Sequence, residues 1–98
     1  MLRMKKVIDF EEAKLRYKLD KIVRQLRKIY NDIEISYYFL PQQVGFKFVK
    51  NQYIRLLIIP YIELESYNIE QLLKFNLNNF CYEIYEKREK EIKGEKNV

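Results

Sequence analysis

The sequence predicts an α+β fold: a long N-terminal helix, a three- to four-stranded antiparallel meander and a long C-terminal helix. Apolar residues recur at helical spacing in both end segments and alternate with polar residues in the middle third. The expected strands are joined by connections too short for parallel crossovers, so neighbouring strands are expected to be antiparallel. A chain of 98 residues with 48% hydrophobic content can build one core. We expect a single domain over residues 1–92 and a flexible C-terminal tail over residues 93–98.

The first helix is predicted over residues 9–31. Asp9 is the expected N-cap, with Glu12 completing a pair that resembles a capping box. An apolar stripe, widened by Val23 and Tyr30, follows at spacings of four and three residues: Leu15, Leu19, Ile22, Leu26 and Ile29. No Gly or Pro interrupts this segment, so we expect one continuous helix with its apolar side on the sheet.

Strand spacing begins after the first helix. Alternation predicts strands over residues 33–39, 44–48 and 53–59, with turns at 41–43 and 50–52. Pro60 cannot donate to a ladder and is expected to end the third strand or to bulge an edge. Residues 61–65 are expected to form a short fourth strand with Ile62 and Leu64 facing inward.

The third strand is apolar on both of its faces, so both faces of the sheet are expected to be covered. The second face should carry Tyr38, Leu40 and Val49 with one set from the third strand, either Ile54, Leu56 and Ile58 or Leu57 and Ile59. A chain of this length has too little sequence left to cover that face. We therefore expect a symmetric homodimer.

The second helix is predicted to start after Asn68, a good N-cap. Its apolar stripe steps by three and four residues, with Leu72, Cys81 and Tyr85 alongside: Ile69, Leu73, Leu77, Phe80 and Ile84. After Glu86 the pattern fades into charged residues. This end is expected to be a solvated helical end.

Several classes of chemistry are excluded by composition. The chain has no His and no Thr, only one Cys, and only two Gly. A zinc site, a His-activated nucleophile and a glycine-rich phosphate loop therefore cannot be built. Cys81 is expected to be a buried small apolar residue. We expect no catalytic residues, no metal and no cofactor.

Paired carboxylates are the one enzymatic route left open. Glu63 and Glu65 would share one face of the fourth strand, and Asp32 and Glu34 flank the first helix–strand junction. A solvated polar face explains the same pattern and is the favoured interpretation. The longest apolar run, Leu56 to Ile59, is far too short for a membrane span. We expect a cytoplasmic protein without membrane association.

Positive charge is concentrated in the N-terminal third. Residues 1–30 hold ten Lys or Arg against four acids, whereas residues 69–98 hold six of each. At 100° per residue, four lysines of the first helix fall within an arc of about 80°, with Arg24 and Tyr17 beside them. These candidate nucleic-acid-binding residues are Lys14, Tyr17, Lys18, Lys21, Arg24 and Lys28.

Other charges near this face have other expected roles. Arg16 and Asp20 are expected to form a surface ion pair, and Arg3, Lys5 and Lys6 to precede the helix on a flexible basic arm. A basic helix with an exposed Tyr suits contact with phosphates. A solvated helix face would also be rich in Lys, so this interpretation stays open.

The chain resembles, in size and composition, the small uncharacterised orphan proteins of crenarchaeal filamentous and rod-shaped viruses. The resemblance is carried by Ile33-Glu-Ile-Ser-Tyr-Tyr-Phe-Leu, by Leu56-Leu-Ile-Ile-Pro-Tyr-Ile, and by nine Tyr, no His, no Trp and one Cys. It implies a protein of unknown biochemical role, made in an infected archaeal cell, that binds host or viral components. No motif is matched, so no functional residue is carried over.

The favoured function is therefore a non-enzymatic protein-interaction module with a host or viral protein partner, in the host cell cytoplasm if the protein is viral. The alternative is sequence-tolerant nucleic-acid binding through the basic face of the first helix.

Overall fold

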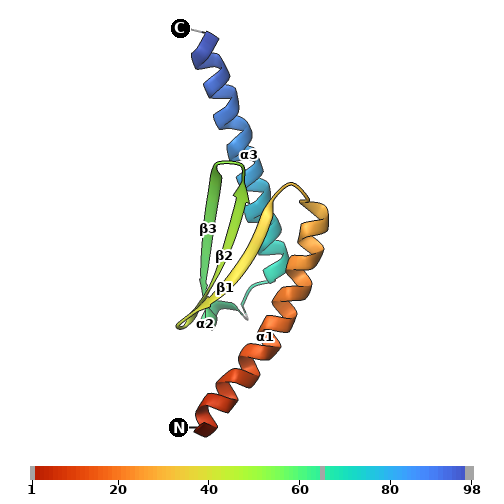
Figure 1. The fold of residues 1–98 in the computed structure, drawn as a ribbon, viewed down its shortest axis with the longest axis vertical. Coiled ribbons are helices and arrows are strands. Elements are labelled where there is room, and N and C mark those ends of the chain that lie inside the picture. Colours follow the sequence, from red (N-terminus) through yellow and green to blue (C-terminus); the bar gives the residue numbers. More distant parts are fainter. Residues whose placement is uncertain (1, 65, 97–98) are drawn as a thin grey trace.

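The computed structural model describes residues 2–64 and 66–96, with side chains described for 12–64 and 66–92. Its elements are α1 (Leu2–Ile29), β1 (Glu34–Leu40), β2 (Gln43–Lys50), β3 (Tyr53–Pro60), α2 (Tyr61–Leu64) and α3 (Ile69–Lys96). The strands form an antiparallel meander in the order β1-β2-β3 (Figure 1). The predicted α+β architecture, in which a long helix precedes and another follows an antiparallel meander along the chain, is confirmed.

Helix α1 begins at Leu2, well before the predicted start. Asp9 therefore lies inside the helix, and its prediction as the N-cap is wrong. The residues before it include Leu, Arg, Met and Lys, all good helix formers, and no Gly or Pro, so nothing stops the helix from continuing towards the N-terminus. Arg3, Lys5 and Lys6 belong to the helix backbone and not to an arm preceding it; their side chains lie outside the described residues.

The two hairpins reverse direction over two residues each. Pro41 and Gln42 separate β1 from β2, and Asn51 and Gln52 separate β2 from β3. Gln42 has φ 63° and Asn51 has φ 55°, both in the left-handed region. Asn adopts this region more readily than most residues because its short polar side chain can hydrogen-bond locally.

The predicted fourth strand is wrong, because residues 61–64 form the short helix α2. Pro60 is the last residue of β3, paired with Gln43, and the Tyr61 N–H turns away to donate to the Gln42 carbonyl at 2.9 Å. Leu64 is buried as expected, but Ile62 is 88% exposed. Glu65 lies outside the described residues.

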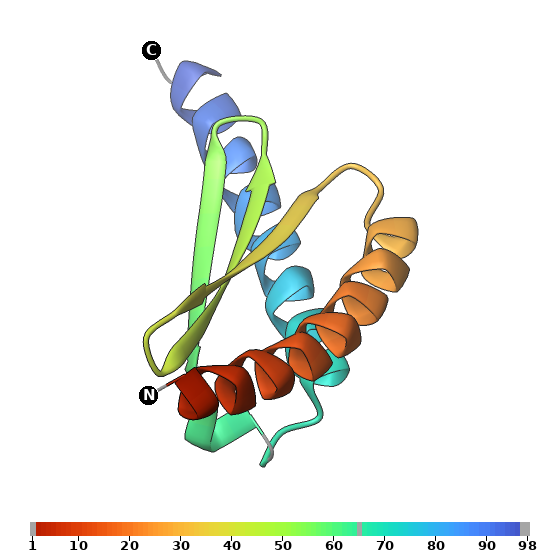
Figure 2. The ribbon, with the colours of Figure 1, turned by 60° about the horizontal axis from the view of Figure 1, so that its bottom comes forward.

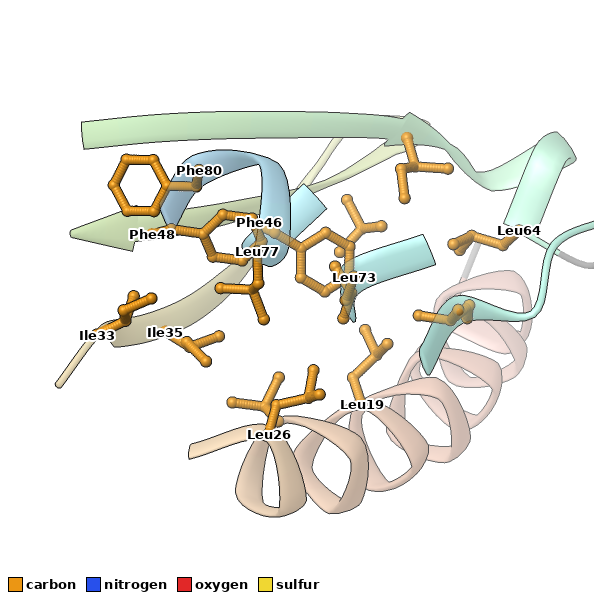
Figure 3. Packing of buried hydrophobic residues seen from close by; sticks show 14 of the residues in the cluster. Leu19, Leu26, Ile33, Ile35, Phe46, Phe48, Leu64, Leu73, Leu77 and Phe80 are labelled. Carbon is orange, nitrogen blue, oxygen red and sulfur yellow. The ribbon is translucent and has the colours of Figure 1, made fainter. Parts of the chain in front are cut away.

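Both long helices cover one face of the sheet and leave the other face open (Figures 1 and 2). The core lies between the sheet and the two long helices, where Phe46 and Phe48 of β2 meet side chains from α1 and α3 (Figure 3). Arg27 fixes the end of α1 to β1, since its Nε and Nη2 donate to the Ile35 carbonyl at 3.1 and 2.7 Å.

Helix α3 starts as predicted. The Gln71 N–H donates to Asn68 Oδ1 at 3.2 Å, which is the expected N-cap contact. All five residues of its predicted apolar stripe are buried: Ile69, Leu73, Leu77, Phe80 and Ile84. The helix backbone then runs past the sheet to Lys96, while α1 projects at the opposite end (Figure 1). The boundary at residue 92 and the flexibility of the tail stay predictions.

No helix in the described part of the chain combines the length and the apolar character needed to cross a membrane.

Candidate nucleic-acid interface

The rotation of α1 is set by the side chains that it buries. Leu19, Val23 and Leu26 have almost no exposed surface and pack against the sheet and α3. At 100° per residue, Lys28 lies opposite Leu19, so this packing turns the lysines away from the core. All six predicted binding residues are exposed, and we call them the basic face: Lys14, Tyr17, Lys18, Lys21, Arg24 and Lys28. The cations extend over residues 14–28, or about 21 Å at 1.5 Å per residue.

Both acids of α1 whose side chains the structure describes make contacts beside the basic face. Glu12 pairs with Arg16 at 3.4 Å, and Asp20 Oδ1 accepts a hydrogen bond from the Tyr37 hydroxyl at 2.5 Å. The predicted Arg16–Asp20 ion pair is therefore wrong. Arg16 instead reaches back one turn to Glu12 and lies 4.9 Å from the centroid of the Phe39 ring. Neither carboxylate forms an ion pair with Lys18, Lys21, Arg24 or Lys28.

Four cations of the basic face carry most of the excess positive charge on the described surface. Within the described residues, Lys18, Lys21, Arg24 and Lys28 form no ion pair. Residues 12–29 hold seven Lys or Arg against two acids. A positive potential along α1 follows, strongest where α1 faces away from the sheet.

Elsewhere the charges are largely matched. Lys50 Nζ lies 2.8 Å from Asp32 Oδ2, and this hydrogen bond holds the pKa of the Asp32 carboxyl below its usual range. Arg55 of β3 pairs with Glu83 of α3. Residues 31–98 hold nine Lys or Arg against ten acids, so the excess of positive charge lies in the N-terminal third.

Exposed aromatic side chains accompany the cations. Tyr17 is 75% exposed within the basic face. Three further aromatics, Phe75, Tyr82 and Tyr85, are exposed on α3. The sequence interpretation placed Tyr85 beside the buried stripe and assigned no role to Phe75 or Tyr82. A helical wheel of α3 would have predicted their exposure, because Phe75 and Tyr82 lie far from the buried Leu77 around the helix axis.

The open face of the sheet is a second, apolar surface. The register pairs Tyr38, Gly45 and Ile58 across the three strands, so these residues point to the same side. Ile54, Leu56 and Ile58 alternate along β3 on this side and are between 47% and 59% exposed. Of the two sets considered from the sequence, this is the one that the structure exposes.

The groups considered for catalysis are dispersed. Cys81 is half-buried, and burial raises the pKa of its thiol, which disfavours the reactive thiolate. Glu63 is exposed on α2, not on a strand. No group of three or more His, Cys, Asp or Glu that could hold a metal ion occurs in the part of the chain that the structure describes. The absence of catalysis and of cofactors stays a prediction.

Comparison with protein-family models, with curated proteins and with solved structures gives no match to this chain. The fold and its surfaces are therefore the basis for a proposal about function.

Proposed function

We propose that the protein binds the phosphate backbone of nucleic acids through the basic face of α1. The observation that carries this proposal is a row of exposed cations, four of them without an ion pair among the described residues, on the side of α1 opposite its buried stripe. A merely solvated helix face gains solubility equally well from mixed charges. Here Glu12 and Asp20 contact other partners, which leaves Lys18, Lys21, Arg24 and Lys28 available to an anionic ligand.

The spacing of the cations suits a polyanion. Side chains three and four residues apart on a helix lie about 5–6 Å from each other, and α1 presents Lys14, Lys18, Lys21, Arg24 and Lys28 at such spacings. A nucleic-acid strand offers a phosphate about every 3.4 Å along the duplex axis. The roughly 21 Å row can therefore face several successive phosphates. Contacts of this kind position the ligand and carry no sequence information, so binding is sequence-tolerant.

Charge reversal on two surfaces tests this proposal. One variant combines Lys18→Glu with Lys21→Glu on the basic face. The control combines Arg88→Glu with Lys90→Glu, which changes the net charge equally on the exposed, charge-balanced end of α3. Fluorescence anisotropy with labelled oligonucleotides of several sequences at 50 mM salt measures binding, and circular dichroism checks the fold.

The first variant should lose at least about 100-fold in affinity on any sequence, because it removes two phosphate contacts and adds two repulsive ones. The control should stay within about threefold of the wild type. Equal losses in both variants would mean that net charge alone matters, and no binding by the wild type would reject the proposal.

A protein-interaction role through the open face of the sheet is a second proposal, and we propose a second copy of this chain as the occupant. The specific observation is the exposed aliphatic row Ile54, Leu56 and Ile58 on β3. Three strands of about eight residues make a face of roughly 25 by 14 Å. Two such faces cover roughly 700 Å² in projection, which is below the range for stable specific interfaces, so we expect a weak dimer that forms only at high protein concentration.

The charges of the open face favour a second copy over a nucleic acid. The face carries one acid, Glu34, and one base, Lys47, so it has no net charge. The basic face of α1 would repel another copy, whereas the open face lies on the other side of the sheet from both long helices (Figure 2). Lys47 lies on the central strand, so a dimer must pair it with Glu34 or leave its ammonium group at the rim.

Light scattering across a concentration series tests this second proposal. The wild type should shift from 12.2 kDa towards twice that mass. Leu56→Lys should abolish the shift because it buries a second ammonium group beside Lys47, its register partner on β2. Ile62→Lys, at an equally apolar but separate exposed residue of α2, should not. A wild type that remains monomeric at high concentration would reject the second copy, and a host or viral partner would then be the occupant to seek.

A further inference from the structure

We infer that the nucleic acid recognised by this protein is single-stranded. The inference rests on the proposed function and names the ligand class for the same surface. It comes from aromatic side chains that lie exposed on α3 beside the basic face, where a duplex could not use them but unpaired bases could.

Three large aromatic side chains on α3 are unusually exposed. Phe75 is 64%, Tyr82 61% and Tyr85 62% exposed, although α3 has a fully formed buried stripe on its other side. On a helical wheel Phe75 and Tyr82 lie about 140–160° away from buried Leu77, so they point away from the sheet. Burial of the stripe therefore does not account for them.

The aromatics of α3 and the cations of α1 belong to one side of the molecule. Both helices pack on the same face of the sheet, so the sides opposite their buried residues point outward together (Figures 1 and 2). The Tyr30 hydroxyl at the end of α1 donates to Asn78 Oδ1 of α3 at 2.7 Å. Asn78 lies between Phe75 and Tyr82 in the sequence, so this contact holds the end of α1 against the segment of α3 that carries the aromatics.

A basic track next to flat aromatic side chains matches the chemistry of an unpaired strand. Bases without partners expose their π faces and stack on Phe or Tyr, and such stacking tolerates any base. The bases of a duplex are already stacked on one another and present only their edges in the grooves. Tyr17, inside the basic face, adds an exposed aromatic on α1.

The carboxylate of Glu86, next to Tyr82, disfavours phosphates on this part of α3. The side chain of Glu86 accepts a hydrogen bond from Tyr82, which raises the pKa of that phenol. A carboxylate at this point repels phosphates. The backbone should therefore follow α1, with the bases turned towards Phe75 and Tyr82.

Anisotropy with labelled 20-nucleotide poly(dT) and a labelled 20-base-pair duplex tests the inference. The wild type should bind poly(dT) at least about tenfold more tightly than the duplex at the same salt concentration. Phe75→Ala and Tyr82→Ala should each weaken poly(dT) binding about five- to tenfold, within the range known for base–aromatic stacking, and leave duplex binding within twofold. Tyr67→Ala, an exposed aromatic outside α3, is the matched control and should change neither.

A tryptophan reporter separates direct stacking from a structural effect. The chain has no Trp, so Phe75→Trp introduces a single indole. Stacking should quench its emission when poly(dT) is added, whereas Tyr67→Trp should stay unquenched. Equal affinity for both ligands, with Phe75→Ala silent and no quenching, would overturn the single-strand inference and leave the proposed function standing. No binding to either ligand would overturn both.

Discussion

The phenol ring of Tyr38 lies directly over Gly45 on the neighbouring strand. A Cβ at residue 45 would be only 2.5 Å from Tyr38 Cζ, a distance that non-bonded carbon atoms do not reach. The two residues are register partners on the open face of the sheet. Gly45 therefore lets the ring of Tyr38 lie flat, which buries Gly45 and covers part of an otherwise open surface.

Replacing Gly45 tests this contact. Gly45→Ala should destabilise the protein by about 1–3 kcal/mol, because the added methyl group must displace the ring. The same change in a Tyr38→Ala background should be neutral or slightly stabilising. The unfolded chain has less conformational entropy with Ala than with Gly, so less entropy is lost on folding. Urea unfolding of the four proteins gives the coupling between the two sites. An equal cost in both backgrounds would show that the ring is not the obstacle.

Two arginines of α1 should respond in opposite ways to the same substitution. Arg27→Met should cost about 1–2 kcal/mol of stability, because the partly buried guanidinium donates two hydrogen bonds to the Ile35 carbonyl. Arg24→Met should change stability by less than about 0.5 kcal/mol, as for ordinary surface positions, and should weaken oligonucleotide binding instead. Unfolding and anisotropy on both variants check the pair. A large loss of stability from Arg24→Met would mean that this side chain has a structural role.

Alkaline pH should reveal the contact between Tyr37 and Asp20. Burial, together with the hydrogen bond to Asp20, raises the pKa of Tyr37 to about 12. The unfolded chain releases this proton near pH 10 and the folded chain keeps it, so the stabilisation is complete below pH 10 and is lost as the pH rises towards 12.

The free energy of unfolding at pH 9, 10 and 11 measures this effect. The decline with pH should be shallower in Tyr37→Phe than in the wild type, since the other tyrosines contribute equally to both. Parallel declines would show that Tyr37 keeps an ordinary pKa.

High thermal stability is expected from a charged content of 34%, only two Gly and two-residue turns. We expect a cooperative unfolding midpoint above about 80 °C, well beyond the range of about 45–65 °C typical of mesophilic domains. Scanning calorimetry checks this value. A midpoint near 55 °C would contradict this expectation.

The elements fixed by local patterning were predictable from the sequence. The five buried residues of α3 and its Asn68 cap follow from helical spacing and capping chemistry alone. The alternation along the first two strands likewise predicted the face that meets the helices, whereas the third strand is apolar on both faces and its orientation was left open. The exposure of the six residues of the basic face was also predictable, because the buried stripe of an amphipathic helix fixes its outer side.

Features that depend on tertiary contacts were missed. The Asp9 cap is a different case, because the residues before it are good helix formers without Gly or Pro and already allowed an earlier helix start. Residues 61–64 alternate like a strand, but Tyr61 bonds back to the first hairpin, and the segment forms α2. Arg16 does not pair with Asp20, because the Asp20 carboxylate accepts a hydrogen bond from Tyr37, which lies seventeen residues further along the chain.

The salt dependence of oligonucleotide binding tests the role of the basic face most directly. The logarithm of the association constant for poly(dT) should fall with the logarithm of salt concentration with a slope of about −3.5, since about 0.7 counterions are released for each of five phosphate contacts on a single strand. Replacing Lys21 and Lys28 together by Ala should make the slope shallower by about 1.4, and replacing Arg88 and Lys90 by Ala should leave it unchanged. A slope near zero, or one that is the same in all three proteins, would contradict phosphate binding by α1.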